Sequence, residues 1–334
     1  MALRACEIMP PSPPVPGAAF RSFPPVPGVF FDPYQKQSRG ITMSRRVRKA
    51  VFPVAGMGTR FLPATKTMAK EMLPVVDKPL IQYAVEEAAA AGIDHFIFIT
   101  GRGKSVLMDH FDHMPELEAL LKERGKTDVL ENLLGSMPSP GKVFSTRQQQ
   151  PLGLGHAVWC ARAFIGDEPF AVLLPDDLVL ADTPCIKQLI DAHAQTGGNV
   201  VAVEDVPRER TNKYGILDVV EDNGTLARAK GLVEKPDSDK APSTLAIIGR
   251  YVLDPGIFDL LENQNRGAGG EIQLTDAMNA QIKDVPFHGL RYEGARYDCG
   301  DKVGFLQANI AFALERPDMR DAVKAVLADF AKTI

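Results

Sequence analysis

After its first 48 residues, the sequence alternates short apolar runs with stretches of helical periodicity, and this alternation limits the possible folds more than any other feature. Lys49–Val54, His95–Thr100 and Pro169–Leu174 have the length and composition of buried strands. Pro79–Ala91 and Pro184–Gln195 carry apolar residues at helical spacing. Strands that alternate with helices in this way are typical of a mainly parallel sheet covered by helices. We therefore predict an α/β fold.

The same periodicities assign the remaining segments. Further strands are expected at Lys142–Arg147, Asn199–Glu204, Tyr214–Val219, Ala229–Val233, Ala246–Val252 and Phe287–Tyr292. Further helices are expected at Lys104–Phe111, Glu116–Leu134, Gly155–Ala163, Pro255–Glu262, Ile272–Ile282, Lys302–Glu315 and Pro317–Ala331. After Pro207 the regular alternation is lost, which indicates a sheet of mixed character in the second half of the chain.

The first 48 residues differ in kind from the rest, because they hold nine of the 26 prolines. Runs of proline exclude both helix and central strand, so we predict a disordered N-terminal extension at 1–48. Two other hypotheses stay open: the segment is a ligand for an aromatic-lined groove, or Met43 is the initiator and the preceding residues are not translated. One domain at 49–316 and a C-terminal helix at 317–334 complete the predicted organisation.

Composition excludes several classes of function. The 38 lysines and arginines and 42 aspartates and glutamates give a net charge of −4 with no long block of like charge, so nucleic-acid binding is not expected. No segment supplies the roughly 18 apolar residues that a membrane span needs, and no signal peptide is recognisable. Cys6, Cys160, Cys185 and Cys299 are scattered, which fits neither a disulfide framework nor a zinc site. We expect a cytoplasmic protein.

The first predicted strand leads into a glycine-rich turn, Ala55-Gly56-Met57-Gly58-Thr59-Arg60-Phe61. Turns of this kind let the backbone approach phosphate groups closely. Phe61 stands where a dinucleotide-binding fingerprint needs glycine, and no Gly-Lys-Ser/Thr follows, so neither that fingerprint nor a P-loop is present. Lys70 comes ten residues after Arg60 and supplies a second cation able to reach a polyphosphate.

The turn and the segment after it combine into GxGTRxxPxT…KEMLPVxDKPLIQY, which closely resembles the signature of sugar-1-phosphate nucleotidylyltransferases. The resemblance continues through Arg147-Gln148, Gly153-Leu154-Gly155-His156-Ala157, Leu174-Pro175-Asp176-Asp177, Lys213-Tyr214-Gly215, Val233-Glu234-Lys235-Pro236, Gly270-Glu271-Ile272-Gln273-Leu274-Thr275-Asp276 and Tyr297-Asp298-Cys299-Gly300-Asp301. It implies a Rossmann-like mixed, mainly parallel sheet of the nucleotidyltransferase type, with a smaller sugar-side subdomain. The Lys-Glu-Met-Leu-Pro form is similar to the bacterial branch that uses UTP and glucose 1-phosphate.

The resemblance also implies the reaction. An oxygen of the sugar 1-phosphate attacks the α-phosphorus of the nucleoside triphosphate in line, and pyrophosphate leaves. Because the second pKa of a phosphate monoester lies near ~6, the nucleophile is already largely ionised at neutral pH and needs no general base. The protein must instead bring two anions together and stabilise the charge that moves onto the leaving group.

Two carboxylates are the expected metal ligands. Asp176 follows a predicted buried strand, where open α/β sheets place their ligands, and Asp298 lies in a second short motif far along the chain. The resemblance implies that both hold Mg²⁺, a hard cation that takes few protein carboxylates and binds phosphate oxygens as well. Asp177 and Asp301 are interpreted as turn or helix-capping residues.

The remaining expected site residues are carried over from the family's motifs. The resemblance implies a catalytic set of Arg60, Lys70, Asp176 and Lys235. Nucleotide binding is assigned to Ala55, Gly56, Gly58, Thr59, Arg60, Gln148, Gly153 and Asp176, and sugar-phosphate binding to Tyr214, Gly215, Glu234, Lys235 and Glu271. The amide of Gln148 has both a donor and an acceptor for the imide edge of uracil, although the adjacent Gln149 and Gln150 leave this assignment open by one register.

Other readings remain at this point. Asp109-His110-Phe111-Asp112-His113 is rich in metal-binding residue types, but its spacing completes no zinc motif, so a solvated helix end is expected. Thymine differs from uracil by one methyl, worth only ~1–3 kcal/mol of discrimination, so a thymidylyltransferase is the nearest alternative enzyme. A sugar-nucleotide-binding regulatory protein without turnover is the alternative of another class. The family resemblance also implies a homodimer or homotetramer.

Overall fold

The computed structural model describes residues 46–263, 267 and 270–333. All but the last three residues of the predicted N-terminal extension, together with Cys6 and the proposed initiator Met43, therefore lie outside the described residues. No helix among the described residues is both long and apolar enough to cross a membrane.

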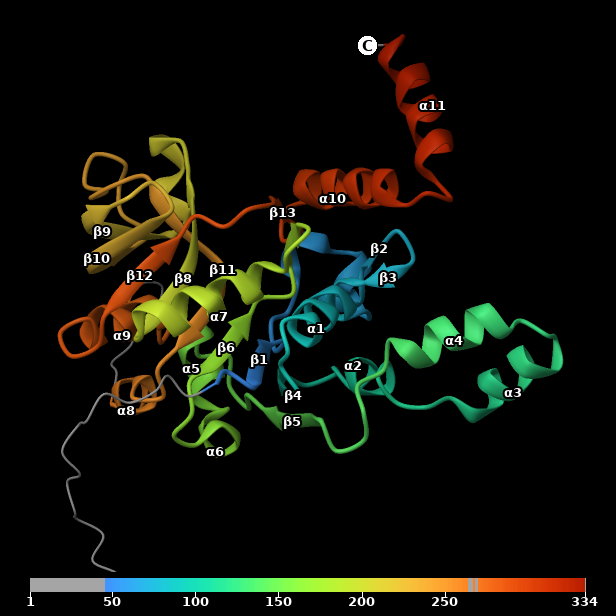
Figure 1. The fold of residues 1–334 in the computed structure, drawn as a ribbon, viewed down its shortest axis with the longest axis horizontal. Coiled ribbons are helices and arrows are strands. Elements are labelled where there is room, and N and C mark those ends of the chain that lie inside the picture. The colour runs from blue at the N-terminus through green and yellow to red at the C-terminus, as the bar shows by residue number, and fades with distance from the viewer. Residues whose placement is uncertain (1–45, 264–266, 268–269, 334) are drawn as a thin grey trace, which may run out of the picture. The chain divides into compact units, whose positions relative to one another are not determined.

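A nine-stranded mixed sheet forms the centre of the fold (Figure 1), in the order β5-β4-β1-β6-β11-β8-β12-β10-β9. Its strands are β1 (Lys49–Pro53), β4 (His95–Thr100), β5 (Val143–Arg147), β6 (Phe170–Leu173), β8 (Asn199–Asp205), β9 (Gly215–Asp222), β10 (Leu226–Glu234), β11 (Leu245–Leu253) and β12 (Phe287–Leu290). The strands β5, β4, β1 and β6 pair in parallel, whereas β10 and β11 pair antiparallel with each of their neighbours. The expected mixed α/β fold is confirmed.

Apolar residues lie on both faces of the sheet because helices cover both faces. Along β1, Ala50 and Phe52 belong to one hydrophobic cluster and Val51, between them, belongs to another, as the alternation of side chains along a strand requires. All three are fully buried. The sheet therefore separates two cores, and the central strands can be recognised in the sequence as continuous apolar runs.

Each covering helix packs on one of the two faces of the sheet and contributes to the core on that face. The first core takes residues from α1 (Leu80–Ala90) and α7 (Cys185–Thr196). The second takes residues from α5 (Leu154–Trp159), α6 (Arg162–Ile165), α8 (Ile257–Glu262) and α9 (Leu274–Gln281). Two further helices, α10 (Lys302–Glu315) and α11 (Arg320–Ala331), close the chain and contact each other.

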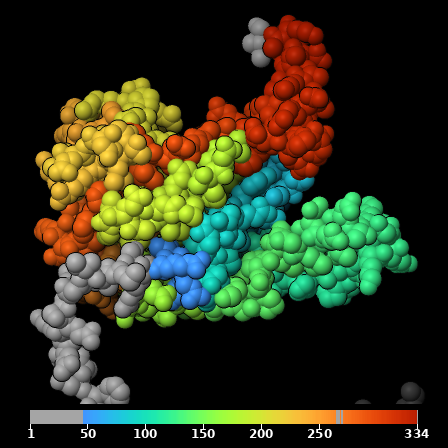
Figure 2. Space-filling view, in the orientation of Figure 1, coloured from blue at the N-terminus to red at the C-terminus, as the bar shows by residue number. Residues whose placement is uncertain are grey.

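The insertion between β4 and β5 differs from the prediction. One long helix was expected at Glu116–Leu134, but the structure has two, α3 (Pro115–Glu123) and α4 (Thr127–Gly135), after a short α2 (Val106–Asp109). Gly125 lies between them with a φ of 65°, a left-handed conformation that ends a helix. No residue of α3 or α4 is buried, and Figure 2 shows this hairpin, in green, as a distinct part of the surface.

Two small sheets were not anticipated. β2 (Pro74–Val75) pairs with β3 (Lys78–Pro79), and β7 (Asp177–Leu180) pairs antiparallel with β13 (Ala295–Asp298). Asp177 does close a turn, since its backbone N–H donates to the carbonyl oxygen of Leu174, but it also begins β7 and faces Asp298 across the pair, which was not expected. Asp301 does cap a helix, since its carboxylate accepts hydrogen bonds from the backbone of Val303 and Gly304 at the start of α10.

Candidate active site

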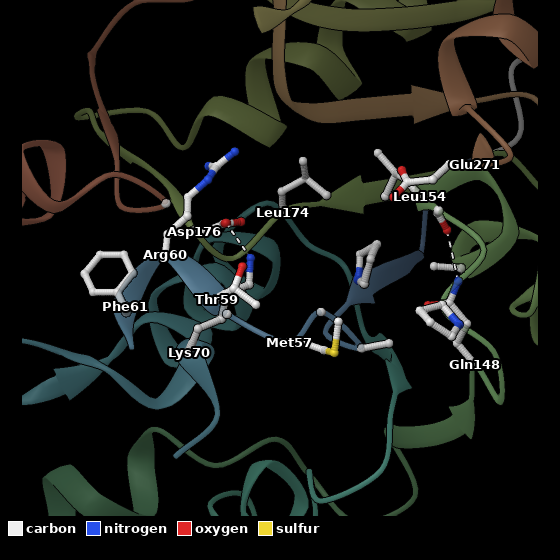
Figure 3. Close-up of a pocket in the computed structure, with 18 residues that line it drawn as sticks. Met57, Thr59, Arg60, Phe61, Lys70, Gln148, Leu154, Leu174, Asp176 and Glu271 are labelled. Carbon is white, nitrogen blue, oxygen red and sulfur yellow. Dashed lines mark hydrogen bonds and ion pairs between the residues drawn. The ribbon is translucent and has the colours of Figure 1, made fainter. Parts of the chain in front are cut away.

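A cavity of about 580 Å³ opens where β1 and β6 end at their carboxyl termini (Figure 3). Parallel strands of an open sheet present their ligands at this edge. The cavity is lined by Pro53, Ala55, Gly56, Met57, Gly58, Thr59, Arg60, Phe61, Lys70, Gln148, Pro151, Gly153, Leu154, Ala157, Leu174, Asp176, Glu271 and Gly300. Arg60, Lys70 and Asp176 lie together at one end of it, and Gln148 and Glu271 lie at the other.

The glycine-rich turn folds back onto Lys70. Gly58 has a φ of 64°, and a Cβ there would lie 3.0 Å from Cβ of Lys70 and 3.3 Å from Thr65. The hydroxyl of Thr65 donates a hydrogen bond to the carbonyl oxygen of Gly58 at 2.6 Å. A larger residue at this position would therefore be strained and would push Lys70 out of place.

Lys70 and Asp176 form the central ion pair of the cavity. Nζ of Lys70 donates to Oδ2 of Asp176 at 2.6 Å, across 106 residues of sequence. Burial alone would lower the pKa of Lys70, but the charges of Asp176 and Glu71 outweigh it and raise that pKa. Burial likewise opposes ionisation of Asp176, yet Lys70 holds the pKa of this carboxyl below its usual value. Both groups are therefore charged at neutral pH.

Asp298 joins this group from β13. A Cβ placed on Gly300 would lie 3.0 Å from Oδ1 of Asp298, 3.2 Å from Oδ2 of Asp176 and 3.3 Å from Nη1 of Arg60. The two carboxylates and the guanidinium therefore converge around one glycine that leaves room between them. Burial and the charges of Asp177 and Asp176 raise the pKa of Asp298, so a nearby cation would favour its ionised form.

These carboxylates fit a divalent cation that takes oxygen ligands. Among the described residues, no group of three or more His, Cys, Asp or Glu side chains is arranged to hold a metal ion. A hard cation that keeps several waters and takes phosphate oxygens needs only one or two protein carboxylates. Asp176 and Asp298 supply two, beside a cavity large enough for a ligand with phosphate groups.

At the other end of the cavity, Gln148 is held in place by hydrogen bonding. Its Nε2 donates to the carbonyl oxygen of Gly153 at 3.0 Å and lies 3.1 Å from Nδ1 of His156. The neighbouring Gln149 and Gln150 line a separate cavity of about 440 Å³. Of the three consecutive glutamines, Gln148 is therefore the one that the structure brings to the main cavity.

The residues expected to bind the sugar gather where β9 begins and β10 ends. Glu234 ends β10 and pairs with Lys235 at 3.0 Å, while the backbone N–H of Lys235 donates to the carbonyl oxygen of Tyr214. A Cβ on Gly215 would lie 3.3 Å from Oε2 of Glu234. Lys235 has a φ of 46°, which is costly for a residue with a side chain.

Glu271 is placed differently from these four residues. It lines the main cavity, and its Cβ lies 2.7 Å from where a Cβ on Gly153 would be. Tyr214, Gly215, Glu234 and Lys235 do not belong to that lining. The residues predicted from the sequence thus form three groups. The candidate phosphate-binding residues lie at one end of the cavity, Gln148 lies at the other end, and the cluster around Glu234 and Lys235 lies outside the cavity lining.

Comparison with known proteins decides the family. A family model described as nucleotidyl transferase matches residues 49–313. The chain belongs to the nucleotidyl transferase family. It is 51% identical over 277 residues to a UTP–glucose-1-phosphate uridylyltransferase of Staphylococcus haemolyticus, covering 83% of this chain and 96% of that one. It is 56% identical over 261 residues to the enzyme of the same name from Komagataeibacter xylinus, covering 78% and 92%.

Solved structures give the same result for this nucleotidyl transferase. A UDP-glucose pyrophosphorylase of Acinetobacter baumannii superposes with a TM-score of 0.79 at 41% identity, over 85% of this chain and 99% of that one. A UDP-glucose pyrophosphorylase complexed with UDP-glucose gives a TM-score of 0.73 at 42% identity, over 81% and 100%. The expected resemblance and the expected class of enzyme, a nucleotidyltransferase, are confirmed.

The histidine-containing segment and Cys299 do not belong to the lining of the main cavity. Nε2 of His110 lies 3.0 Å from Oε1 of Gln82, and His113 pairs with Glu118 on the surface. Cys299 is 1% exposed, and burial raises the pKa of its thiol to about 12. A packed thiol of this kind is a poor nucleophile at neutral pH, as expected from the sequence.

Two ion pairs beside the site were not predicted. Glu71 pairs with Lys104, and Asp177 pairs with Arg296, both at 2.5 Å. Each pair joins segments that are far apart in sequence, so no local sequence pattern predicts which residues pair. The apolar surroundings of Glu71 in the sequence were the one available signal, because a charged residue inside an apolar run often has a buried partner.

We expect Lys104→Met to destabilise the fold strongly. Glu71 is fully buried and Lys104 is 8% exposed, so removal of the lysine leaves a buried carboxylate without its counter-charge, at a cost of about 3–5 kcal/mol. Urea unfolding measures the change. The double variant Glu71→Gln/Lys104→Met should recover part of the loss, and Lys187→Met, which breaks the exposed pair with Asp191, should cost less than about 1 kcal/mol. Equal effects of Lys104→Met and Lys187→Met would contradict the prediction.

Proposed function

We propose that this chain is a Mg²⁺-dependent UTP–glucose-1-phosphate uridylyltransferase that forms UDP-glucose and pyrophosphate. The observation that carries the proposal is the convergence of Arg60, Lys70 and Asp176 at one end of a single cavity, with Asp298 beside them at Gly300. This set combines two cations for phosphate oxygens with two carboxylates for a metal ion. The names of the relatives at 51–56% identity support the choice of UTP and glucose 1-phosphate.

The reaction needs charge and alignment more than proton transfer. The phosphate of glucose 1-phosphate is largely ionised at neutral pH, so it attacks without a general base. Arg60 and Lys70 neutralise the triphosphate, and Lys70 can exchange part of its contact with Asp176 for a phosphate oxygen as the leaving group gains charge. Asp176 and Asp298 would hold Mg²⁺, which when bound would supply further stabilisation of charge on the phosphate oxygens.

Two separate parts of the site select the two substrates, the amide end of the cavity and the cluster around Glu234 and Lys235 outside its lining. The amide of Gln148, oriented by Gly153 and His156, offers a donor and an acceptor to the edge of the uracil ring. We place the base there, with Ala55 and Gly56 also in the lining and Glu271 close by, whereas Thr59 lies at the phosphate end beside Lys70 (Figure 3). A smaller sugar-side subdomain built on β9 and β10 holds the hexose near Tyr214, and Glu234 and Lys235 bind its hydroxyls and its 1-phosphate.

The proposal also includes the boundaries of the domain. We place the nucleotidyltransferase domain at 49–316 and treat 317–334 as an appended C-terminal helix. The observed α11 (Arg320–Ala331) supports this division, because it has no buried residue and contacts α10.

Release of pyrophosphate tests the proposed substrates. We expect release with UTP and glucose 1-phosphate to exceed release with dTTP by about tenfold or more, since dTTP carries an extra ring methyl, worth ~1–3 kcal/mol in a fitted pocket, and lacks the ribose 2′-hydroxyl. Galactose 1-phosphate is the control acceptor, and chelation of Mg²⁺ should stop the reaction. Preference for dTTP would move the chain to the thymidylyltransferases. Absence of release from a folded sample that still binds nucleotide would favour a regulatory protein.

A further inference from the structure

Arg296 contacts side chains from three separate segments of the chain, although the motifs of the sequence gave it no role. Its side chain is 10% exposed, and its Nε donates to Oδ1 of Asp177 at 2.5 Å. Its Nη1 lies 3.6 Å from Oε2 of Glu204 on β8. Its Cζ lies 5.5 Å from the centre of the Tyr214 ring, within the range of a cation–π contact.

Both carboxylate oxygens of Asp177, the partner of Arg296, accept hydrogen bonds. Oδ1 of Asp177 accepts from Arg296, and Oδ2 accepts from the backbone N–H of Gly249 on β11 at 2.8 Å. Asp177 follows Asp176 directly in the chain, so this anchoring fixes the backbone that carries one of the two proposed metal ligands. Because Asp177 is 7% exposed, its charge depends on Arg296 for compensation.

The other proposed metal ligand is anchored to the same pair. Asp298 lies opposite Asp177 in the β7–β13 sheet, and Arg296 lies two residues before it on β13. The backbone N–H of Cys299 donates to the carbonyl oxygen of Asp176 at 2.7 Å. A two-stranded sheet of four residues a strand is marginal by itself, so the Arg296–Asp177 ion pair is a main support of the spacing between Asp176 and Asp298.

We propose that Arg296 is a positioning residue that links the metal carboxylates to the sugar pocket, by holding β13 against β7 with one side of its guanidinium and Tyr214 with the other. The inference rests on the proposed function, because it takes Asp176 and Asp298 as metal ligands and Tyr214 as a sugar-binding residue. Lysine cannot replace the fork of arginine at such a position, since its single ammonium group cannot contact Asp177 and Tyr214 in the same geometry.

Binding measurements on Arg296→Lys test this role separately from turnover. We expect the affinity for UDP-glucose, measured by calorimetry, to fall by about tenfold, while the affinity for UDP stays within about twofold, because the loss concerns the sugar contact. The affinity for Mn²⁺, followed by the electron paramagnetic resonance of the free ion, should also fall by about tenfold. Asp177→Asn, which keeps the size of the side chain but removes its charge, should reproduce the loss of Mn²⁺ affinity.

Arg291→Lys is the matched control. Arg291 also forms forked ion pairs, with Asp205 and Asp222, and is 27% exposed, but neither partner adjoins Asp176 or Asp298 in the chain or belongs to the proposed sugar pocket. The control should lower the melting temperature and leave both affinities unchanged. A positioning role is rejected if Arg296→Lys behaves in the same way, with lower stability and unaltered binding of UDP-glucose and Mn²⁺.

The wild-type chain separates this inference from the proposed function. If wild-type protein binds UDP-glucose no more tightly than UDP, the proposed function fails in its sugar half. A second outcome is that wild-type protein binds UDP-glucose more tightly than UDP, and that Arg296→Lys and Asp177→Asn both keep this preference and the wild-type affinity for Mn²⁺. In that case the proposed function stands and the role of Arg296 is wrong.

Discussion

Replacing Asp298 with alanine is expected to lower kcat by about a thousandfold or more while the protein remains folded. Asp298 and Asp176 approach the same point above Gly300, and loss of one carboxylate leaves half of the proposed metal site. A thousandfold loss corresponds to about 4 kcal/mol of transition-state stabilisation, within the range of a metal ion acting on phosphate oxygens. The pairing of β13 with β7 uses backbone groups, so the fold should survive the change.

Steady-state formation of pyrophosphate measures this effect, with circular dichroism as the test of folding. Asp301→Ala is the matched control, three residues along the chain. Asp301 caps α10, so its loss should cost about 1 kcal/mol of stability and leave kcat nearly unchanged. Turnover by Asp298→Ala within about tenfold of wild type would reject the metal role, because each tenfold step is only about 1.4 kcal/mol.

The second large effect is expected for Lys70→Met, with a fall of about a thousandfold in kcat/KM for UTP. The ammonium group of Lys70 lies 2.6 Å from Asp176, and methionine keeps its length but not its charge. Removal leaves Asp176 without its partner and takes away one of the two side-chain cations proposed to stabilise developing charge on the leaving group, each a loss of several kcal/mol in a site sheltered from water.

Single-turnover kinetics with radiolabelled UTP separate the chemical step from binding in this variant. Lys122→Met is the matched control, because Lys122 is an exposed lysine in α3 and does not line the cavity. The control should be indistinguishable from wild type. If Lys70→Met lost affinity for UTP but kept its rate of chemistry, Lys70 would be a binding residue without a role in the transition state.

Much of the fold follows from local sequence because its strands are buried on both faces. His95–Thr100 was predicted with both bounds correct, and Lys49–Val54 differs from β1 by one residue. Short continuous runs of apolar residues such as these are typical of strands that are buried on both faces, so their assignment as strands and the positions of their ends are clear. Lys302–Glu315 was also predicted with both bounds correct, since Asp301 marks its start.

The predicted phosphate-binding residues meet for a topological reason. Arg60 and Asp176 follow β1 and β6, which are adjacent parallel strands, so their positions after the carboxyl ends of these strands bring them to one edge of the sheet. Lys70 is carried to the same place by the turn that packs on Gly58. These contacts depend on the order of the strands as well as on motif spacing, and the expected fold type did not specify that order.

Other contacts could not be read from the sequence. The strands β7 and β13 are four residues long and are 115 or more residues apart, too short for a clear alternating pattern. Arg296 has no local partner, because Asp177 lies 119 residues away. The same holds for Lys104 and Glu71, which are 33 residues apart. Long-range ion pairs depend on the final packing, and single-sequence periodicity carries no information about them.

Direct identification of the products tests the central claim most sharply. Phosphorus-31 NMR of the protein with UTP, glucose 1-phosphate and Mg²⁺ should show UDP-glucose and pyrophosphate appearing in equal amounts. Neither product should appear when either substrate is omitted. The same reaction should run backwards when UDP-glucose and pyrophosphate are supplied. Appearance of UDP and inorganic phosphate instead, or no consumption of either substrate by a folded sample, would contradict the account.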